Sequence, residues 1–281
     1  MARKIAIVTD STADLTPEMV EEMGVTIVRL RVIFGNEAYR EGVDITTEEF
    51  YERLVKSRQL PTTSAPSVGD FQEVYERLLK EADSIVSIHI AGKLSATVEA
   101  ARTARQSVAK PERIEVVDSQ MVTMATGFAI MDAADAIRAG AKLAEVKAVA
   151  ESAFQRVHVR AMVDTLEYLR RGGRIGRVRA YLGTLLSVRP ILSLREGELY
   201  PEERVRTRAR GLERMTQWAV KHQNVKRLVV AHSTTPDDAE TIRERLAMAF
   251  PNVKVQVIRF GPVIGTHGGP GIVGVGVMEG E

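Results

Sequence analysis

Short apolar runs alternate with helical stretches along most of the chain, and this alternation restricts the fold more than any other feature. Residues 4–9 form an apolar run, and Thr16-Pro17 then supplies an N-cap and a first-turn proline for a helix. Further apolar runs at residues 84–90 and 114–117 are each followed by a hydroxyl-bearing loop and a helix. Strands that alternate with helices predict crossover units, so we expect an α/β fold with mostly parallel sheets.

A second group of strands is expected in the C-terminal half. A long helical region covers residues 121–154, and strands return at residues 157–163, 191–194, 228–231, 253–258 and 272–277. The 281 residues suffice for two hydrophobic cores, because single domains typically hold about 100–200 residues. We therefore expect two α/β domains, residues 1–158 and residues 159–281.

Composition excludes several classes of function. Thirty-nine basic and 37 acidic residues leave a net charge of +2, so no global field attracts nucleic acid or an anionic membrane. The absence of cysteine excludes disulfides, thiolate nucleophiles and cysteine-type zinc sites, and favours the cytoplasm. Residues 260–278 carry no Asp, Glu, Lys or Arg, but their glycines and prolines argue against stable membrane insertion.

A glycine- and proline-rich segment near the C-terminus is a candidate site. Residues 260–271 place His267 between two valine-rich strands, as the only side chain of the segment that titrates near neutral pH. Glycine permits a close approach of the backbone to a ligand, and proline stiffens the segment. The segment therefore favours a functional loop, with a tight turn around a chance histidine as the alternative.

Hydroxyl side chains gather in loops where ligands bind in parallel α/β sheets, beyond the carboxyl ends of the strands. Such hydroxyls commonly cap helices, but together with helix amide groups they can also bind a pair of anionic oxygens. A serine without a basic partner is a poor nucleophile, so we interpret these residues as ligand holders. They include Thr62, Thr63, Ser64, Ser95 and Ser119.

Motifs for nucleotides and metals are incomplete. Gly92-Lys93-Leu94-Ser95 resembles the end of a P-loop, but Ser87 and Leu94 stand where Gly and a hydroxyl are required. The segment from Gly274 lacks the third glycine of a dinucleotide fingerprint, and the histidines lie apart in sequence. We expect no cofactor and no metal, and we interpret His89 and His158 as structural histidines within strands.

Arginines are concentrated in two places. Five lie within residues 170–179, and four occupy alternate positions from Arg204 to Arg210. Guanidinium groups clamp phosphate well, while a solvated basic face is the alternative. Nucleic acid is not an expected partner, because the aromatic residues are not interleaved with the basic ones.

Five segments taken together resemble the DegV family of bacterial proteins, in the family's order and over the whole length. They are residues 10–15, 61–67, 93–97, 165–174 and 265–271. The chain departs from the family pattern at Ala65, where Gln is usual, and at Ala96, where Gly is usual, which puts the preferred acyl chain length in question.

The resemblance implies a carrier and not an enzyme. On this model one long-chain fatty acid, C16–C18, lies between the two domains with its carboxylate held by Thr63 and Ser95. A separate ATP-dependent fatty acid kinase would then form the acyl phosphate for phospholipid metabolism. His267 and an arginine among Arg171, Arg174 and Arg206 would lie near the headgroup, balance the phosphate charge or contact the kinase, with His267 and Arg206 as candidates to assist phosphotransfer.

Two other functions stay open on the sequence alone. The chain could be a self-sufficient enzyme in which His267 acts as general acid or base on a phosphorylated small molecule that the arginines grip. It could also be a lipid sensor or interaction module that shares the pocket of the carrier and differs only in its partner.

Overall fold

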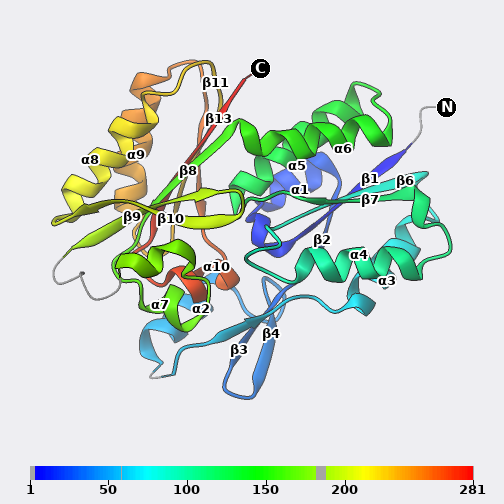
Figure 1. Ribbon diagram of the computed structural model, residues 1–281, viewed down its shortest axis with the longest axis horizontal. Coiled ribbons are helices and arrows are strands. Elements are labelled where there is room, and N and C mark those ends of the chain that lie inside the picture. The colour runs from blue at the N-terminus through cyan, green and yellow to red at the C-terminus, as the bar shows by residue number, and fades with distance from the viewer. Residues whose placement is uncertain (1–3, 58, 182–187, 281) are drawn as a thin grey trace. The chain divides into compact units, whose positions relative to one another are not determined.

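The computed structural model describes residues 4–57, 59–181 and 188–280, and the chain divides into two compact units (Figure 1). The first comprises Met1–Arg31 and Thr63–Gln155, and the second comprises Val32–Thr62 and Arg156–Glu281. The sequence predicted residues 32–62 in the first domain, but they group with the second unit. Tyr51 donates a hydrogen bond to the carbonyl of Phe260 at 3.0 Å, so this segment packs on the C-terminal part of the chain.

The first unit contains a four-stranded, fully parallel sheet, as the sequence predicted. Its strands are β1 (Ile5–Asp10), β2 (Val25–Val28), β6 (Ser84–His89) and β7 (Ile114–Asp118), in the order β2-β1-β6-β7. Every residue of β6 is buried, which is typical of a parallel strand that is covered on both faces.

Helices cover this sheet. They are α1 (Pro17–Met23), α3 (Val68–Leu78), α4 (Thr97–Ser107), α5 (Met124–Arg138) and α6 (Leu143–Ser152), with short 3-10 turns at Ser11–Ala13, Pro111–Arg113 and Ala153–Gln155. Ser67 and Asp70 form the predicted capping box of α3. Helices α3 and α4 pack together, and Phe71 and Tyr75 lie fully buried against Ile85 of the sheet. Helices α5 and α6 pack against each other and contact β6.

The second unit contains a six-stranded sheet in the order β10-β9-β8-β13-β11-β12. Only the β11–β12 pair is parallel, so the expectation of a mostly parallel sheet is wrong for this unit. Glu196 and Gly197 have φ angles of 49° and 74° and join β9 to β10 in a two-residue hairpin turn, which makes that pair antiparallel. The strands are β8 (Val157–Met162), β9 (Arg189–Arg195), β10 (Glu198–Val205), β11 (Val225–His232), β12 (Val255–Arg259) and β13 (Val273–Glu279).

Two groups of helices accompany this sheet. Helices α8 (Arg208–Ala219) and α9 (Pro236–Ala249) lie side by side against it, and Met215, Ile242 and Leu246 fill the core between them and the strands (Figure 1). A second group consists of α2 (Thr47–Lys56), α7 (Glu167–Arg171) and α10 (Pro262–Gly268), in which α10 contacts both others. The remaining elements are β3 (Arg31–Phe34), β4 (Glu37–Arg40), β5 (Thr62–Ser64) and a 3-10 turn at Gly176–Tyr181.

No helix among the described residues is both long enough and apolar enough to span a membrane.

Candidate functional site

In the first unit, the loop that carries Ser95 is fixed at the carboxyl edge of the parallel sheet. The strand order reverses between β1 and β6, which makes this edge a topological switch point, the usual place for a ligand. The amide of Ile90 donates to Oδ2 of Asp10 at 3.1 Å, and the amide of Ala91 donates to the carbonyl of Met121 at 2.9 Å. The loops after β1, β6 and β7 are therefore held together.

Ser95 itself lies at the start of α4. Its Oγ shares a hydrogen bond with Oγ1 of Thr97 at 2.8 Å and accepts the amide of Thr97 at 3.3 Å. The N-cap residue of α4, Ala96, makes no side-chain cap hydrogen bond. A partly exposed hydroxyl thus caps the first amide of α4, while the N-cap residue adds no side-chain acceptor, and such a helix N-terminus can hold a carboxylate.

The other hydroxyl positions differ in how much surface they offer. Thr63 and Ser64 are partly exposed on β5, and Thr62 is exposed at its start. Ser119 is only 1% exposed, and its Oγ accepts the amide of Met121 at 3.1 Å, so in this structure Ser119 stabilises a turn. Ligand binding by Thr62, Thr63, Ser64, Ser95 and Ser119 stays a prediction.

A buried hydrogen-bond chain lies behind this edge, and the sequence predicted a structural role for only one of its members, His89. Nδ1 of His89 is 2.9 Å from Oδ2 of Asp10, Nε2 of His89 is 2.6 Å from Oγ of Ser87, and Tyr75 donates to the same Oγ at 2.8 Å. The order Asp-His-Ser matches a hydrolase triad. All four side chains are fully buried, so no substrate reaches Ser87, and His89 is a satisfied structural histidine as expected.

In the second unit, the segment around His267 forms the helix α10 and not the loop that the glycines and prolines suggested. Gly261 is the N-cap and Pro262 occupies the first turn, where a proline costs no intrahelical hydrogen bond. The buried Glu41 accepts the amide of Val263 through Oε1 at 2.8 Å. This carboxylate replaces the side-chain cap that Gly261 cannot provide.

The glycines of this segment allow close packing inside the protein. A Cβ on Gly265 would lie 2.5 Å from Oη of Tyr51, and one on Gly269 would lie 2.3 Å from the ring of Tyr168. Gly269 also has a φ of 78°, a conformation that favours glycine. The sequence predicted that these glycines let the backbone approach a ligand, whereas in the structure they let α10 pack close to α2 and α7.

His267 stands in the last turn of α10, against the end of α7. A Cβ on Gly172 would lie 2.2 Å from Nδ1 of His267, so the absence of a side chain there makes room for the imidazole. Burial, and then the positive charge of Arg174, lower the pKa of His267 to about 4. The imidazole is therefore neutral at pH 7, and Arg174 carries the positive charge of this group.

Two of the arginines near α7 are paired with Glu167, which lies just before the arginine-rich residues 170–179. Arg170 and Arg171 both form ion pairs with Glu167 and lower the pKa of its carboxyl to about 2. Arg174 donates to the carbonyl of Gly172 at 2.6 Å. The ion pairs are exposed, and exposed pairs are weak, so Arg170 and Arg171 can exchange Glu167 for an incoming anion.

The alternating arginines from Arg204 to Arg210 do not form one face. Arg204 is in β10 and its guanidinium stacks on the ring of Tyr181. Arg206 is exposed between β10 and α8. Arg208, in α8, is the one held near the C-terminal segment: it donates to the carbonyl of Gly271 at 2.9 Å and pairs with Asp238 at 2.5 Å. Nothing in the spacing of the sequence distinguished Arg208 from Arg206.

Comparison with known proteins gives one consistent family. The family model described as "Uncharacterised protein, DegV family" matches residues 4–280. A DegV domain-containing protein of Streptomyces coelicolor is 40% identical over 283 residues, which cover 99% of this chain and all of the relative.

Solved structures agree with this result. A DegV family protein from Thermus thermophilus, described for its fatty acid binding, is 36% identical with a TM-score of 0.91 and covers 98% of this chain and 99% of its own. A stearic acid-binding protein from Eubacterium ventriosum is 27% identical with a TM-score of 0.91, and 98% of each chain is covered.

Proposed function

Because the chain belongs to the DegV family, we propose that it binds a long-chain fatty acid and presents the carboxylate to a separate ATP-dependent fatty acid kinase. The observation that carries the proposal is the start of α4, where the hydroxyl of Ser95 accepts the amide of Thr97 and the N-cap residue Ala96 adds no side-chain acceptor for the neighbouring amide groups. These are neutral donors that suit a single carboxylate. The fatty acid binding described for the Thermus and Eubacterium proteins supports the same ligand class.

The acyl tail supplies most of the binding energy on this proposal. Burying about 15 methylene groups at roughly 0.8 kcal/mol each contributes on the order of 12 kcal/mol before the cost of ordering the ligand. One hydrogen bond to the carboxylate contributes roughly 1.5–3 kcal/mol. The tail therefore sets affinity, while Ser95 and Thr63 set the position of the headgroup.

The charged groups of the second unit fit a partner step better than a self-sufficient reaction. A general base works best with a pKa near the operating pH, and the pKa of His267 is lowered to about 4 by burial and by Arg174. We therefore propose that an arginine balances the negative charge of the phosphate, with Arg171, Arg174 and Arg206 as candidates. His267 then acts as a neutral hydrogen-bonding group. Acyl phosphate made by the kinase would feed phospholipid metabolism.

The test compares bound lipid with phosphorylation. Native mass spectrometry of freshly purified protein is expected to show an added mass that matches a C16–C18 acid. Ser95→Ala is expected to weaken fatty acid binding by roughly 10–150-fold, the value of one hydrogen bond to a carboxylate, but to lower kinase-dependent acyl phosphate formation much further. Thr63→Ala is expected to behave in the same way.

Ser107→Ala is a matched control, because Ser107 is an exposed serine at the other end of the same helix. It should change neither quantity. Equal losses of lipid and of phosphorylation in Ser95→Ala would contradict the division between tail and headgroup. If the purified protein held no lipid and hydrolysed phosphate esters by itself, the carrier proposal would be wrong and the self-sufficient enzyme would take its place.

A further inference from the structure

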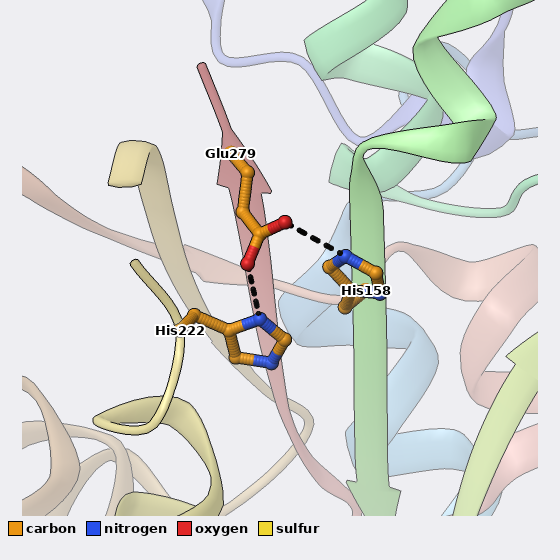
Figure 2. Close-up of side chains that lie close together, drawn as sticks. All are labelled: His158, His222 and Glu279. Atoms are coloured by element: carbon orange, nitrogen blue, oxygen red, sulfur yellow. Dashed lines mark hydrogen bonds and ion pairs between the residues drawn. The ribbon is translucent and has the colours of Figure 1, made fainter. Parts of the chain in front are cut away.

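Two histidines and a glutamate converge in the second unit although they are far apart in sequence. Nδ1 of His222 lies 2.9 Å from Oε1 of Glu279, and Nε2 of His158 lies 3.5 Å from Oε2 of the same carboxylate (Figure 2). The two imidazole rings stack with their centroids 4.7 Å apart. One nitrogen or oxygen from each residue lies within 4.8 Å of the others, and among the described residues this is the one set of three with that property.

Three separate elements supply these side chains. His158 is in β8, His222 follows the end of α8, and Glu279 is the last residue of β13 (Figure 2). His158 pairs with Val277 across the β8–β13 ladder, so the sheet register itself keeps His158 near Glu279. Trp218 lies edge-on to the ring of His222 at 5.0 Å and supports its orientation.

The cluster is distinct from the candidate headgroup site of the same unit. Strand β13 begins at Val273, beside the residues that follow α10, and ends at Glu279. A strand of seven residues spans about 20 Å at roughly 3.4 Å per residue. The cluster and His267 therefore lie at opposite ends of β13, and neither belongs to the chemistry of the other.

The donor set suits a borderline transition metal. Two imidazoles and one carboxylate are the protein ligands of several zinc sites that keep a fourth position for water, whereas magnesium and calcium prefer oxygen ligands only. Tetrahedral ligands with bonds of about 2.0–2.1 Å lie about 3.3 Å from one another. The two imidazole nitrogens lie 2.9 and 3.5 Å from different oxygens of Glu279, close to that value, and the side chains are 15–38% exposed, which leaves room for a small rotation and for water.

We propose that His158, His222 and Glu279 bind one zinc-type divalent cation that clasps β8, β13 and the end of α8 together. From the sequence, His158 is expected to be a structural histidine because it falls in a strand, and no metal is expected because the histidines lie apart in sequence. The fold brings them together. The proposal concerns the stability of the second unit and is independent of lipid binding.

The first experiment measures zinc directly. The full chain, stripped with EDTA and dialysed against low-micromolar zinc chloride, is expected to retain one zinc per chain by elemental mass spectrometry and to unfold at a higher temperature than the stripped protein. The double variant His158→Gln/His222→Gln is expected to retain none. His232→Gln is the matched control, since His232 is in the same unit but at the other end of β11, and it should retain one.

Single variants define the ligand set. Glu279→Gln keeps the shape of the side chain but offers a poor zinc ligand, so the zinc affinity should fall by at least the ~10–100-fold that loss of an outer-shell partner causes. Cobalt substitution provides a spectroscopic check, because four-coordinate cobalt gives much stronger visible absorption than six-coordinate cobalt. The wild type should give the strong spectrum, and the double variant should give none.

A measurement on the wild type covers the case in which the variants misfold. The chain has five histidines, and zinc should shift the imidazole nitrogen resonances of two of them, His158 and His222. Wild-type protein that retains no more zinc than the double variant would overturn the proposal. Zinc-induced shifts confined to other histidines would also overturn it.

Discussion

The lowered pKa of His267 predicts a specific loss of stability in mild acid. The folded-state pKa is about 4, whereas the ordinary value is 6.5, because burial and Arg174 disfavour the charged imidazole. Between these two values the unfolded chain binds a proton that the folded chain does not. The stability that the neutral imidazole contributes is therefore complete above pH 6.5 and declines as the pH falls toward 4.

The size of the effect follows from the two pKa values. Linkage gives a loss of at most about 2 kcal/mol between pH 7 and pH 5 for this one group, and of about 3.4 kcal/mol once the pH is below both values. Because His267 is partly exposed, screening by solvent makes both losses of stability upper limits. A loss of 2 kcal/mol is large beside the 5–15 kcal/mol that folded domains typically have (about 0.05–0.15 kcal/mol per residue).

Urea unfolding at pH 7 and pH 5 measures this loss in the wild type and in His267→Gln. The single tryptophan, Trp218, lies in α8 of the same unit and reports its unfolding by fluorescence. EDTA keeps metal ions out of the measurement, and the other histidines are common to both proteins, so their contributions cancel. The wild type should lose about 2 kcal/mol more than the variant on acidification.

Equal pH dependence in the two proteins would refute this reasoning. A direct titration is an independent check: the ring proton resonances of His267 should stay at their neutral position down to about pH 5, one unit above a pKa of about 4. A midpoint at or above 6.5 would mean that neither burial nor Arg174 acts on the imidazole as the structure indicates.

Two further predictions concern α10. Gly265→Ala should destabilise the second unit by about 1–3 kcal/mol, because its Cβ would overlap Tyr51 and Phe50, and a urea midpoint unchanged from wild type would show that α2 can shift without cost. Glu41→Ala should cost about 1–3 kcal/mol, because it leaves the amide of Val263 buried without its acceptor, and faster amide hydrogen exchange at Val263 should accompany the loss.

The parallel sheet of the first unit was predictable because local signals agreed with the global fold. Caps such as Ser67 with Asp70 mark the helix starts, and short, mostly uncharged runs rich in Ile and Val mark strands covered on both faces. The antiparallel second sheet was not predictable from the same signals. Its direction depends on the Glu196-Gly197 turn, which lacks the Asn-Gly or Asp-Gly sequence that normally announces such a hairpin.

The geometry of the candidate site was likewise predictable only in part from the sequence. The position of Ser95 at the carboxyl edge of the sheet could be predicted because its loop directly follows a strand, and strand ends locate ligand sites in parallel sheets. The neutral state of His267 could not be found, because it depends on Gly172 and Arg174, which are more than 90 positions away in the chain. The His158 cluster likewise depends on a register that only the folded sheet defines.

The assignment of residues 32–62 to the second unit has a consequence for synthesis on the ribosome. This segment leaves the exit tunnel long before its partners, and the Glu41 contact with Val263 spans 222 positions. Contacts between residues so far apart in sequence form slowly. The apolar face of α2 therefore stays exposed to solvent while the rest of the polypeptide is translated. Nascent chains halted before residue 260 should therefore recruit chaperones through this segment, whereas the parallel sheet around β1 can already be complete.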